Sequence, residues 1–302
     1  MIKTAIIPSL DPQGPVAAEM ETLWWMMLAL GGAVFLLFLG LLLRGLARGP
    51  AGRAGERNWL VGGGLLMPLV VVAVVLGFTL VAMARLANQP RENELIVEVV
   101  GHQWWWEVRY PDLGVVTANE IHLPAERPIL LRLRSVDVIH SFWIPTLAGK
   151  MDLLPDKTNT MSFSASQPGT YRGVCAEFCG LQHAKMRLTA LVTTQDDFDA
   201  WADQQAQPAT GGQSRGRDVF LSANCPDCHT VRGTPADGSN GPDLTHFASR
   251  TTLAAGTIPN STEHLTAWVR NPHEFKEGVE MEAAELSEAD LAELVAYLES
   301  LQ

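Results

Sequence analysis

The sequence predicts three structural parts in series: a pair of membrane-spanning helices, a small all-β domain and an all-helical domain. Two charge-free runs, Leu23–Leu43 and Trp59–Met83, predict the helices, because each exceeds the ~18 residues needed to cross a bilayer. Short runs of alternating apolar and polar residues, separated by Pro and Gly turns, predict the β domain. Amphipathic runs in the C-terminal third predict the helical domain.

The composition separates the chain from an ordinary soluble protein. Of 302 residues, 47% are hydrophobic and 18% are charged, whereas charged residues make up about 25% of a typical globular domain. As helices, the two apolar runs would reach about 32 and 37 Å, enough to cross the lipid bilayer. Two buried helices of a soluble protein are the alternative, but a chain of this size has difficulty burying helices that are apolar on all faces. The net charge of −11 argues against nucleic acid as a partner.

Charge also predicts the orientation of the hairpin at 23–83. The connecting loop at 44–58 holds Glu56 and four arginines, Arg44, Arg48, Arg53 and Arg57. Short Arg-rich loops remain cytoplasmic. The N-terminal tail at 1–22 carries one base and three acids, so it lacks the basic region of a signal peptide. We therefore expect both termini and both soluble domains on the extracytoplasmic side of a plasma membrane.

The exported part divides by composition. The β-rich stretch at 91–200 predicts a small antiparallel sandwich or barrel, and the Pro-, Gly-, Ser- and Gln-containing stretch at 201–213 predicts a flexible linker. The helical domain spans 214–302. In its last helix, Ser287 and Asp290 form a capping box, followed by an apolar stripe. That stripe consists of Leu291, Leu294, Val295 and Leu298.

The first cysteine pair lies in a cluster of metal-binding residue types. Cys175, Cys179, His183 and Met186 fall within twelve residues, and His140 lies upstream. Sulfur and imidazole ligands favour copper or zinc, and the thioether favours copper. Two thiolates can bridge a pair of copper ions, whereas a blue-copper centre uses only one. A dinuclear copper centre therefore fits the ligand count, with a disulfide as the alternative.

The second pair forms the motif Cys225-Pro-Asp-Cys228-His229, which is the CxxCH attachment signature of a c-type haem. His229 is then the proximal iron ligand. Met281, the only methionine after Met186, is the predicted sixth ligand, because His/Met ligation raises the potential of a relay haem. His246, His264 and His273 are the alternatives. A thioredoxin-like role for CxxC would need a βαβ unit, which the pattern lacks.

The stretch CAEFCGLQHAKM resembles the CxExCGxxHxxM signature of the dinuclear copper (CuA) site in subunit II of haem-copper cytochrome c oxidases. The resemblance covers the hairpin, the aromatic run GHQWWW and the β domain, roughly residues 10 to 194. It implies a cupredoxin-like fold in which Cys175 and Cys179 bridge two copper ions. The remaining ligands implied are His140, His183, Met186 and the backbone carbonyl of Glu177.

The same resemblance assigns two further roles. It implies that the Glu177 side chain helps to bind magnesium at the contact with subunit I, with a solvated loop acid as the alternative. It also implies that Trp104 is where electrons enter the domain, with packing in the sandwich core as the alternative. A glutamate near a proton-channel mouth in some family members corresponds weakly to Glu56.

The helical domain resembles the small class I cytochromes c. In them a proline carbonyl, here that of Pro242 in NGPDLTHFASR, accepts a hydrogen bond from the proximal imidazole. One departure concerns the loop of the sixth ligand. The family usually has proline directly after the ligating methionine, whereas Glu282 follows Met281 here.

Together the two resemblances imply an oxidase subunit II that carries a fused cytochrome c. Electrons would pass from an upstream donor, such as a cytochrome c or a cytochrome bc complex, to haem c, to CuA, and then to the haems of subunit I, where oxygen is reduced to water. The chain lacks the His-rich helices that would hold those haems. A CuA-containing nitric oxide reductase subunit is the alternative. A nitrous oxide reductase would need a larger catalytic domain. A copper-delivery protein would need an exposed mononuclear site. A quinol oxidase subunit II would lack the copper ligands, whereas this chain has two cysteines in the motif.

Overall fold

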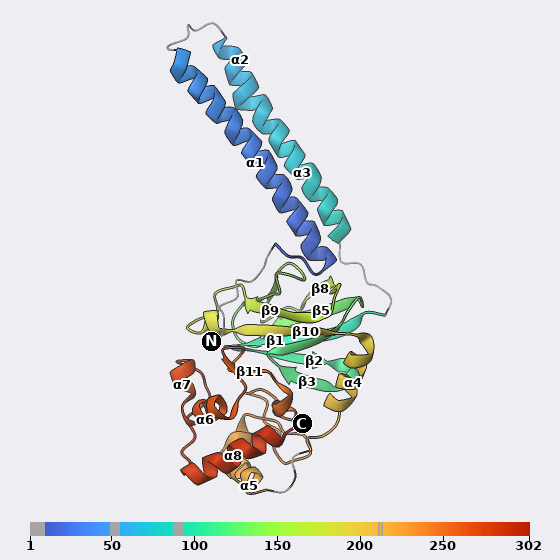
Figure 1. Ribbon diagram of the computed structural model, residues 1–302, viewed down its shortest axis with the longest axis vertical. Helices are drawn as coiled ribbons and strands as arrows, with labels where there is room; N and C mark the ends of the chain where they lie inside the picture. Colours follow the sequence, from blue (N-terminus) through green and yellow to red (C-terminus); the bar gives the residue numbers. More distant parts are fainter. Residues whose placement is uncertain (1–9, 49–54, 87–92, 211, 213) are drawn as a thin grey trace. The chain divides into compact units, whose positions relative to one another are not determined.

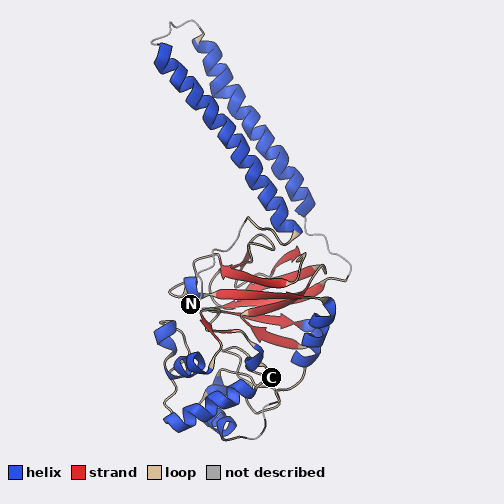
Figure 2. Ribbon diagram, viewed as in Figure 1, coloured by secondary structure: helices blue, strands red, loops and turns tan. Residues whose placement is uncertain are grey.

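The computed structural model describes residues 10–48, 55–86, 93–210, 212 and 214–302, and the side chain of Glu56 lies outside the described part. The chain forms two compact units. One consists of residues 16–89, and the other joins residues 1–15 to residues 90–302. The helices of the first unit and the sheets and helices of the second are drawn in Figures 1 and 2.

The first unit is a helical hairpin. Helix α1 spans Pro15–Arg48, and the second arm consists of α2 (Glu56–Val61), the π-helical segment η1 (Gly62–Leu66) and α3 (Met67–Leu86). Both arms are long and apolar enough to cross a membrane. The π-helical turn has a local explanation: in a regular α-helix the ring of Pro68 would clash with the carbonyl four residues earlier, and the proline nitrogen has no hydrogen to donate. An ion pair of 3.1 Å between Arg85 Nη1 and Glu19 Oε1 shows that the arms are antiparallel.

The second unit begins with a sandwich of two five-stranded sheets. One sheet has the order β3-β2-β1-β5-β8, and the other has the order β4-β10-β9-β6-β7. The first sheet contains β1 (Leu95–His102), β2 (Trp105–Tyr110), β3 (Val115–Ala118), β5 (Ile129–Ser135) and β8 (Asn159–Phe163). The second contains β4 (Glu120–Pro124), β6 (His140–Trp143), β7 (Met151–Leu153), β9 (Gly169–Cys175) and β10 (Arg187–Thr193).

Alternation along the strands creates the core of the sandwich. In β5, Ile129, Leu131 and Leu133 are fully buried, while the residues between them are partly exposed. The expectation of an antiparallel sandwich is wrong in one respect, because β1 pairs with β5 and β4 pairs with β10 in parallel. The alternation of side chains is the same in both pairings, and only the crossover connections between the sheets create the parallel pairs. The fold is the expected cupredoxin-like sandwich.

Helix α4 (Gln195–Gln205) packs against β3 and β4 of the sandwich, and it extends past residue 200 into the stretch predicted as a linker. The side chain of Thr194 caps it by accepting from the amide of Asp197. Trp201 packs edge-on against Tyr110 and stacks on His122, with ring centroids 5.3 and 4.0 Å apart. The Tyr110 hydroxyl lies 2.9 Å from the His122 carbonyl oxygen and 2.7 Å from its amide nitrogen.

The C-terminal domain is built mainly from α5 (Arg215–Ser222), α6 (Thr262–Arg270), α7 (Pro272–Phe275) and α8 (Glu288–Ser300). A short pair of strands, β11 (Thr252–Leu253) and β12 (Ile258–Pro259), accompanies them. Ser287 caps α8 as predicted, since its Oγ accepts from the Asp290 amide at 3.1 Å, but the Asp290 carboxylate accepts from the same hydroxyl at 2.7 Å, which is not the reciprocal backbone bond of a capping box. All four residues of the predicted stripe on α8 are buried in the domain core with Phe220 and Leu265. The expected helical domain is confirmed.

Candidate metal centres

Two strands and one loop bring the predicted copper ligands together. His140 begins β6, Cys175 ends the neighbouring strand β9, and Cys179 lies in the following loop. The turn η3 (His183–Lys185) returns the chain to β10, and the Cys175 amide donates to the Met186 carbonyl at 3.0 Å. Of the predicted ligands, His140, Cys175, Cys179 and Met186 are buried, and His183 is half-buried.

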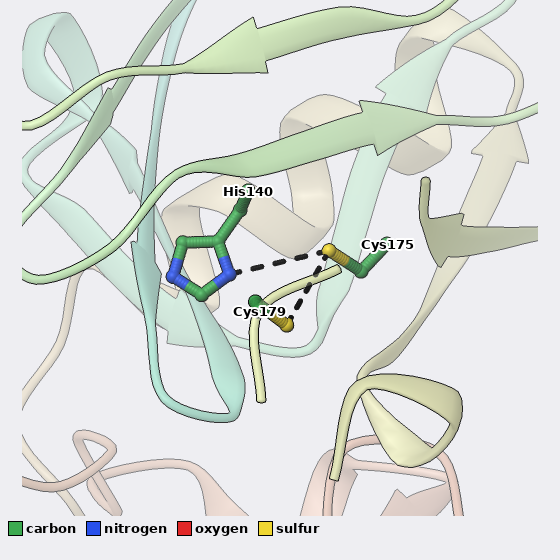
Figure 3. Close-up of side chains that lie close together, drawn as sticks. All are labelled: His140, Cys175 and Cys179. Atoms are coloured by element: carbon green, nitrogen blue, oxygen red, sulfur yellow. Dashed lines mark hydrogen bonds between the residues drawn. The ribbon is translucent and has the colours of Figure 1, made fainter. Parts of the chain in front are cut away.

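The donor atoms converge on the two sulfurs. Cys175 Sγ lies 3.8 Å from Cys179 Sγ, 4.0 Å from His140 Nδ1 and 3.2 Å from the Glu177 carbonyl oxygen. Cys179 Sγ lies 3.6 Å from His183 Nδ1 and 3.8 Å from Met186 Sδ. Figure 3 shows the imidazole of His140 with Nδ1 facing the Cys175 sulfur. The other four predicted donor groups therefore each lie within 4.0 Å of one of the two sulfurs.

The spacing of the sulfurs fits shared metal ligation. Two sulfurs bound to the same ion at about 2.3 Å can be no more than ~4.6 Å apart, and the observed 3.8 Å satisfies this limit. A disulfide requires a sulfur separation of about 2.05 Å, and both cysteines are free thiols here. Two thiolates, two imidazoles, a thioether and a carbonyl form a soft donor set that fits copper.

The two thiols influence each other's ionisation. The hydrogen bond between the two sulfurs lowers the pKa of Cys175 to about 3, and the same interaction raises the pKa of Cys179. Although burial opposes it, hydrogen bonds to Asp137 and Cys175 raise the pKa of His140. Both thiols must lose their protons to bind an ion as thiolates, so metal binding at this pair depends on pH.

Asp137 is a site residue that the sequence reasoning missed. Its Oδ1 lies 2.8 Å from His140 Nε2, and its Oδ2 accepts from the Gln103 amide at 2.6 Å. A hydrogen bond from Nε2–H to the carboxylate leaves the lone pair of Nδ1 directed at the sulfurs. Partners of this kind orient metal-binding imidazoles in proteins. The signal in the sequence was an acid three residues before His140, which is too common a pattern to be informative alone.

Trp104 directly contacts the loop between β9 and β10, residues 176–186, which we call the copper loop. Its indole Nε1 donates to the Cys179 carbonyl at 2.8 Å, and the side-chain amide of Gln103 donates to the same oxygen at 2.7 Å. Gly180 permits this approach, because a Cβ there would lie 3.0 Å from the Trp104 ring, and its φ of +113° also favours glycine. Trp104 is half-buried, so it is not part of the sandwich core.

The other two tryptophans of the run have different surroundings. Trp106 is fully buried and packs against His140 and Phe142, with ring centroids 6.0 and 5.9 Å away. Trp105 is half-buried and stacks on His102. The side chain of Glu177 is exposed, although its carbonyl faces the cysteine pair.

The second motif lies at the start of the helical domain. Cys225 begins the turn η4 (Cys225–Asp227), and Cys225 and Cys228 are both free thiols. His229 Nδ1 lies 2.7 Å from the Pro242 carbonyl oxygen, which is the contact expected for a proximal imidazole. Burial lowers the pKa of His229, so the ring is neutral with Nδ1–H donating and Nε2 available as a ligand. Two thiols and an oriented imidazole fit a covalently attached haem.

The structure leaves the ligand role of Met281 a prediction. Met281 is half-buried in the irregular chain between α7 and α8. Two of the alternative histidines already have protein partners, since His246 Nε2 lies 2.9 Å from the Gln207 carbonyl and His264 Nδ1 lies 2.8 Å from Ser261 Oγ. The third, His273, is exposed.

The two cysteine motifs, on a cupredoxin-like sandwich and a helical domain, define a class of redox protein with a copper-type and a c-type haem site. Residues 114–193 match the family model for the periplasmic domain of cytochrome c oxidase subunit II, and residues 213–302 match the model for cytochrome c. The chain belongs to the cytochrome c oxidase subunit II family, and it carries a cytochrome c domain in addition.

Individual relatives agree with this assignment. Cytochrome c oxidase subunit 2 of Alkalihalophilus pseudofirmus is 34% identical over 82% of this chain and 73% of the relative. The protein of the same name from Bacillus sp. (strain PS3) is 32% identical over 79% of this chain and 71% of the relative. A crystal structure of the periplasmic domain of cytochrome oxidase subunit II from Bradyrhizobium japonicum covers 39% of this chain and 96% of that chain, with 28% identity and a TM-score of 0.38. By its family, the chain is a component of an oxidoreductase complex, and it has two apolar helices and a domain that matches the family's periplasmic domain.

Proposed function

We propose that this chain is the electron-accepting subunit of a membrane cytochrome c oxidase, and that it relays electrons from an upstream donor through haem c and a dinuclear copper centre to subunit I. When bound, the haem and the copper pair supply reversible one-electron chemistry. The observation that carries the proposal is that the two cysteine sulfurs lie 3.8 Å apart, with the donor atoms of His140, His183 and Met186 each 3.6 to 4.0 Å from one of them.

Side chains of both domains would hold the copper pair and the haem in fixed orientations. Cys175 and Cys179 are the proposed bridging ligands, and Asp137 fixes the ring of His140. Cys225 and Cys228 are the proposed attachment points of the haem, with His229 and Met281 as its axial ligands. Pro242 fixes the ring of His229. A rigid, buried ligand set that changes little between oxidation states is what fast electron transfer requires.

The surroundings of the copper loop suggest how the other proposed partners bind. The exposed carboxylate of Glu177 is the proposed ligand for magnesium at the contact with subunit I. Trp104 is the proposed point where electrons enter the copper domain, and its hydrogen bond to the Cys179 carbonyl supports this role.

The topology that we propose places the connecting loop of the hairpin in the cytoplasm and both termini outside it, in a bacterial plasma membrane. The antiparallel arms support this arrangement, because the ion pair between Glu19 and Arg85 places residues near both ends of the hairpin on one side. Cytoplasmic placement of the loop rests on its arginines.

Gas consumption by the intact complex tests the function. We expect the complex, purified with its largest subunit and supplied with an electron donor such as reduced cytochrome c, to consume oxygen, and a Cys175→Ser variant to lose this activity. Consumption of nitric oxide in the absence of oxygen uptake would instead support the nitric oxide reductase alternative. The comparison of the two gases uses one preparation, so the result separates the two functions directly.

A further inference from the structure

One segment of the cytochrome domain lies directly on the copper loop. The carbonyl of Phe275 accepts from Lys185 Nζ, and the carbonyl of Glu277 accepts from Gln182 Nε2 at 2.7 Å. A Cβ on Gly278 would lie 3.3 Å from a methyl group of Leu181. We call residues 275–278 the docking segment. Met281, the proposed haem ligand, follows three residues after the docking segment, so this segment contacts the copper loop and lies close in sequence to a proposed haem ligand.

Lys276 is the central residue of the docking segment. Its Nζ donates to the Trp104 carbonyl at 2.7 Å and to the Lys185 carbonyl at 3.2 Å. The Lys185 carbonyl belongs to the copper loop itself, and the Trp104 carbonyl belongs to the turn between β1 and β2. Lys276 is 2% exposed, so the whole side chain is enclosed between the two domains.

The burial of Lys276 costs free energy. In the described part of the chain, no carboxylate forms an ion pair with it. Burial and the nearby ammonium of Lys185 lower the pKa of Lys276 to about 7. An apolar side chain would fill the same space without this penalty. What the amine adds is a pair of directed hydrogen bonds, which fix the docking segment in one position.

Through Trp104, Lys276 is also linked by hydrogen bonds to a proposed copper ligand. Lys276 donates to the carbonyl of Trp104, and the indole of the same tryptophan donates to the carbonyl of Cys179. Two hydrogen bonds and one residue therefore link the cytochrome domain to a proposed copper ligand.

A second contact supports a fixed arrangement of the two domains. The carboxylate of Glu120, 2% exposed, accepts from both the amide and the hydroxyl of Thr251 in the cytochrome domain. The Arg187 amide also donates to the Ala255 carbonyl at 3.1 Å. Together with the docking segment, this contact holds the domains at two points.

We propose that Lys276 is a positioning residue for electron transfer between the two domains, because it holds the segment preceding Met281 against the carbonyls of Trp104 and Lys185. The proposal rests on the proposed relay function. Lys276 is not a proposed ligand of either metal group, so it acts through the distance and orientation that it imposes. Small displacements of fixed partners have large effects on rates.

The test uses the intact oxidase complex and the substitution Lys276→Met, which keeps the length of the side chain and removes its donors. Haem c is reduced by a laser-flash photoreductant, and its reoxidation is followed together with reduction of the copper centre. We expect Lys276→Met to slow transfer at least 10-fold and to make it sensitive to glycerol viscosity, because the domain must then find its docked position by diffusion. Copper content, haem content and the spectra of both centres should remain unchanged.

Two further variants make the result specific. Arg270→Met removes one positive charge from the same domain at an exposed ion pair with Glu288. Its rate of electron transfer should lie within 2-fold of the rate in the natural chain. Lys276→Gln keeps one short donor, provides a milder variant if the methionine variant does not assemble, and should slow transfer by a smaller factor. Transfer within 2-fold of normal in a Lys276 variant with both centres intact would overturn the proposal. Absence of transfer in the natural chain would instead contradict the relay function itself.

Discussion

The hydrogen bond between Asp137 and His140 gives a sharp test of the copper site. The carboxylate carries four interactions: with His140 Nε2 at 2.8 Å, with the Val138 and Gln103 amides at 2.6 Å each, and with Ser135 Oγ at 3.2 Å. Asp137→Asn keeps the shape but replaces one acceptor oxygen by a donor group. The new amide must therefore point its NH₂ either at the Gln103 amide or at the imidazole of His140.

Either orientation weakens metal binding. An NH₂ facing the Gln103 amide displaces the loop beside Trp104, and an NH₂ facing His140 Nε2 forces the ring proton onto Nδ1, the atom that should bind metal. Loss of a partner that orients a metal ligand costs about 10- to 100-fold in metal affinity, which corresponds to about 1.4 to 2.8 kcal/mol. We expect a loss in this range for Asp137→Asn.

Competition with a copper-specific chelator measures this loss. The matched control is Asp152→Asn, which makes the same chemical change at an exposed residue on the adjacent strand β7, and it should retain normal affinity. Unchanged affinity of the Asp137→Asn variant, within 2-fold of the control, would refute the role assigned to the carboxylate.

Three further predictions concern the haem ligand and the stability of the sandwich. Gly241→Ala would place a methyl group 2.7 Å from the His229 ring, so we expect an altered haem spectrum and potential; a spectrum identical to that of the natural chain would contradict this. Tyr110→Phe removes both hydrogen bonds to the His122 backbone, and urea unfolding should show a loss of about 1–3 kcal/mol, whereas a loss below about 0.5 kcal/mol would contradict the assigned bonds. Burial lowers the pKa of His122 from 6.5 to about 4. Between pH 6.5 and pH 4 the folded chain therefore binds fewer protons than the unfolded chain, and the free energy of unfolding should fall by about 3 kcal/mol as the pH decreases across this range. His122→Phe should reduce this pH dependence, and an equal decrease in both proteins would exclude His122 as its source.

The sequence predicted most of the metal ligands because they are local in the chain. Cys175, Cys179 and Met186 lie within twelve residues of one another, and their chemical types identify the metal class. The apolar stripe on α8 was predictable for a similar reason, since helical spacing alone places its residues on one face.

The contacts that orient the site join distant parts of the chain. Gln103 and Trp104 donate to Cys179 across 76 and 75 positions, and Lys276 reaches Trp104 across 172 positions. No periodicity or motif in the sequence predicts contacts between residues so far apart in the chain. The parallel pairing of β1 with β5 was missed because the same alternation of side chains is compatible with either direction.

The central claim is that Cys175 and Cys179 hold two copper ions between them. The most direct measurement combines copper analysis and electron paramagnetic resonance of the oxidised chain, purified in its native membrane complex. The account predicts two copper ions per chain and a signal from one unpaired electron shared by two copper nuclei. A single copper ion with an unshared signal, or a disulfide between the two cysteines in the native preparation, would contradict it.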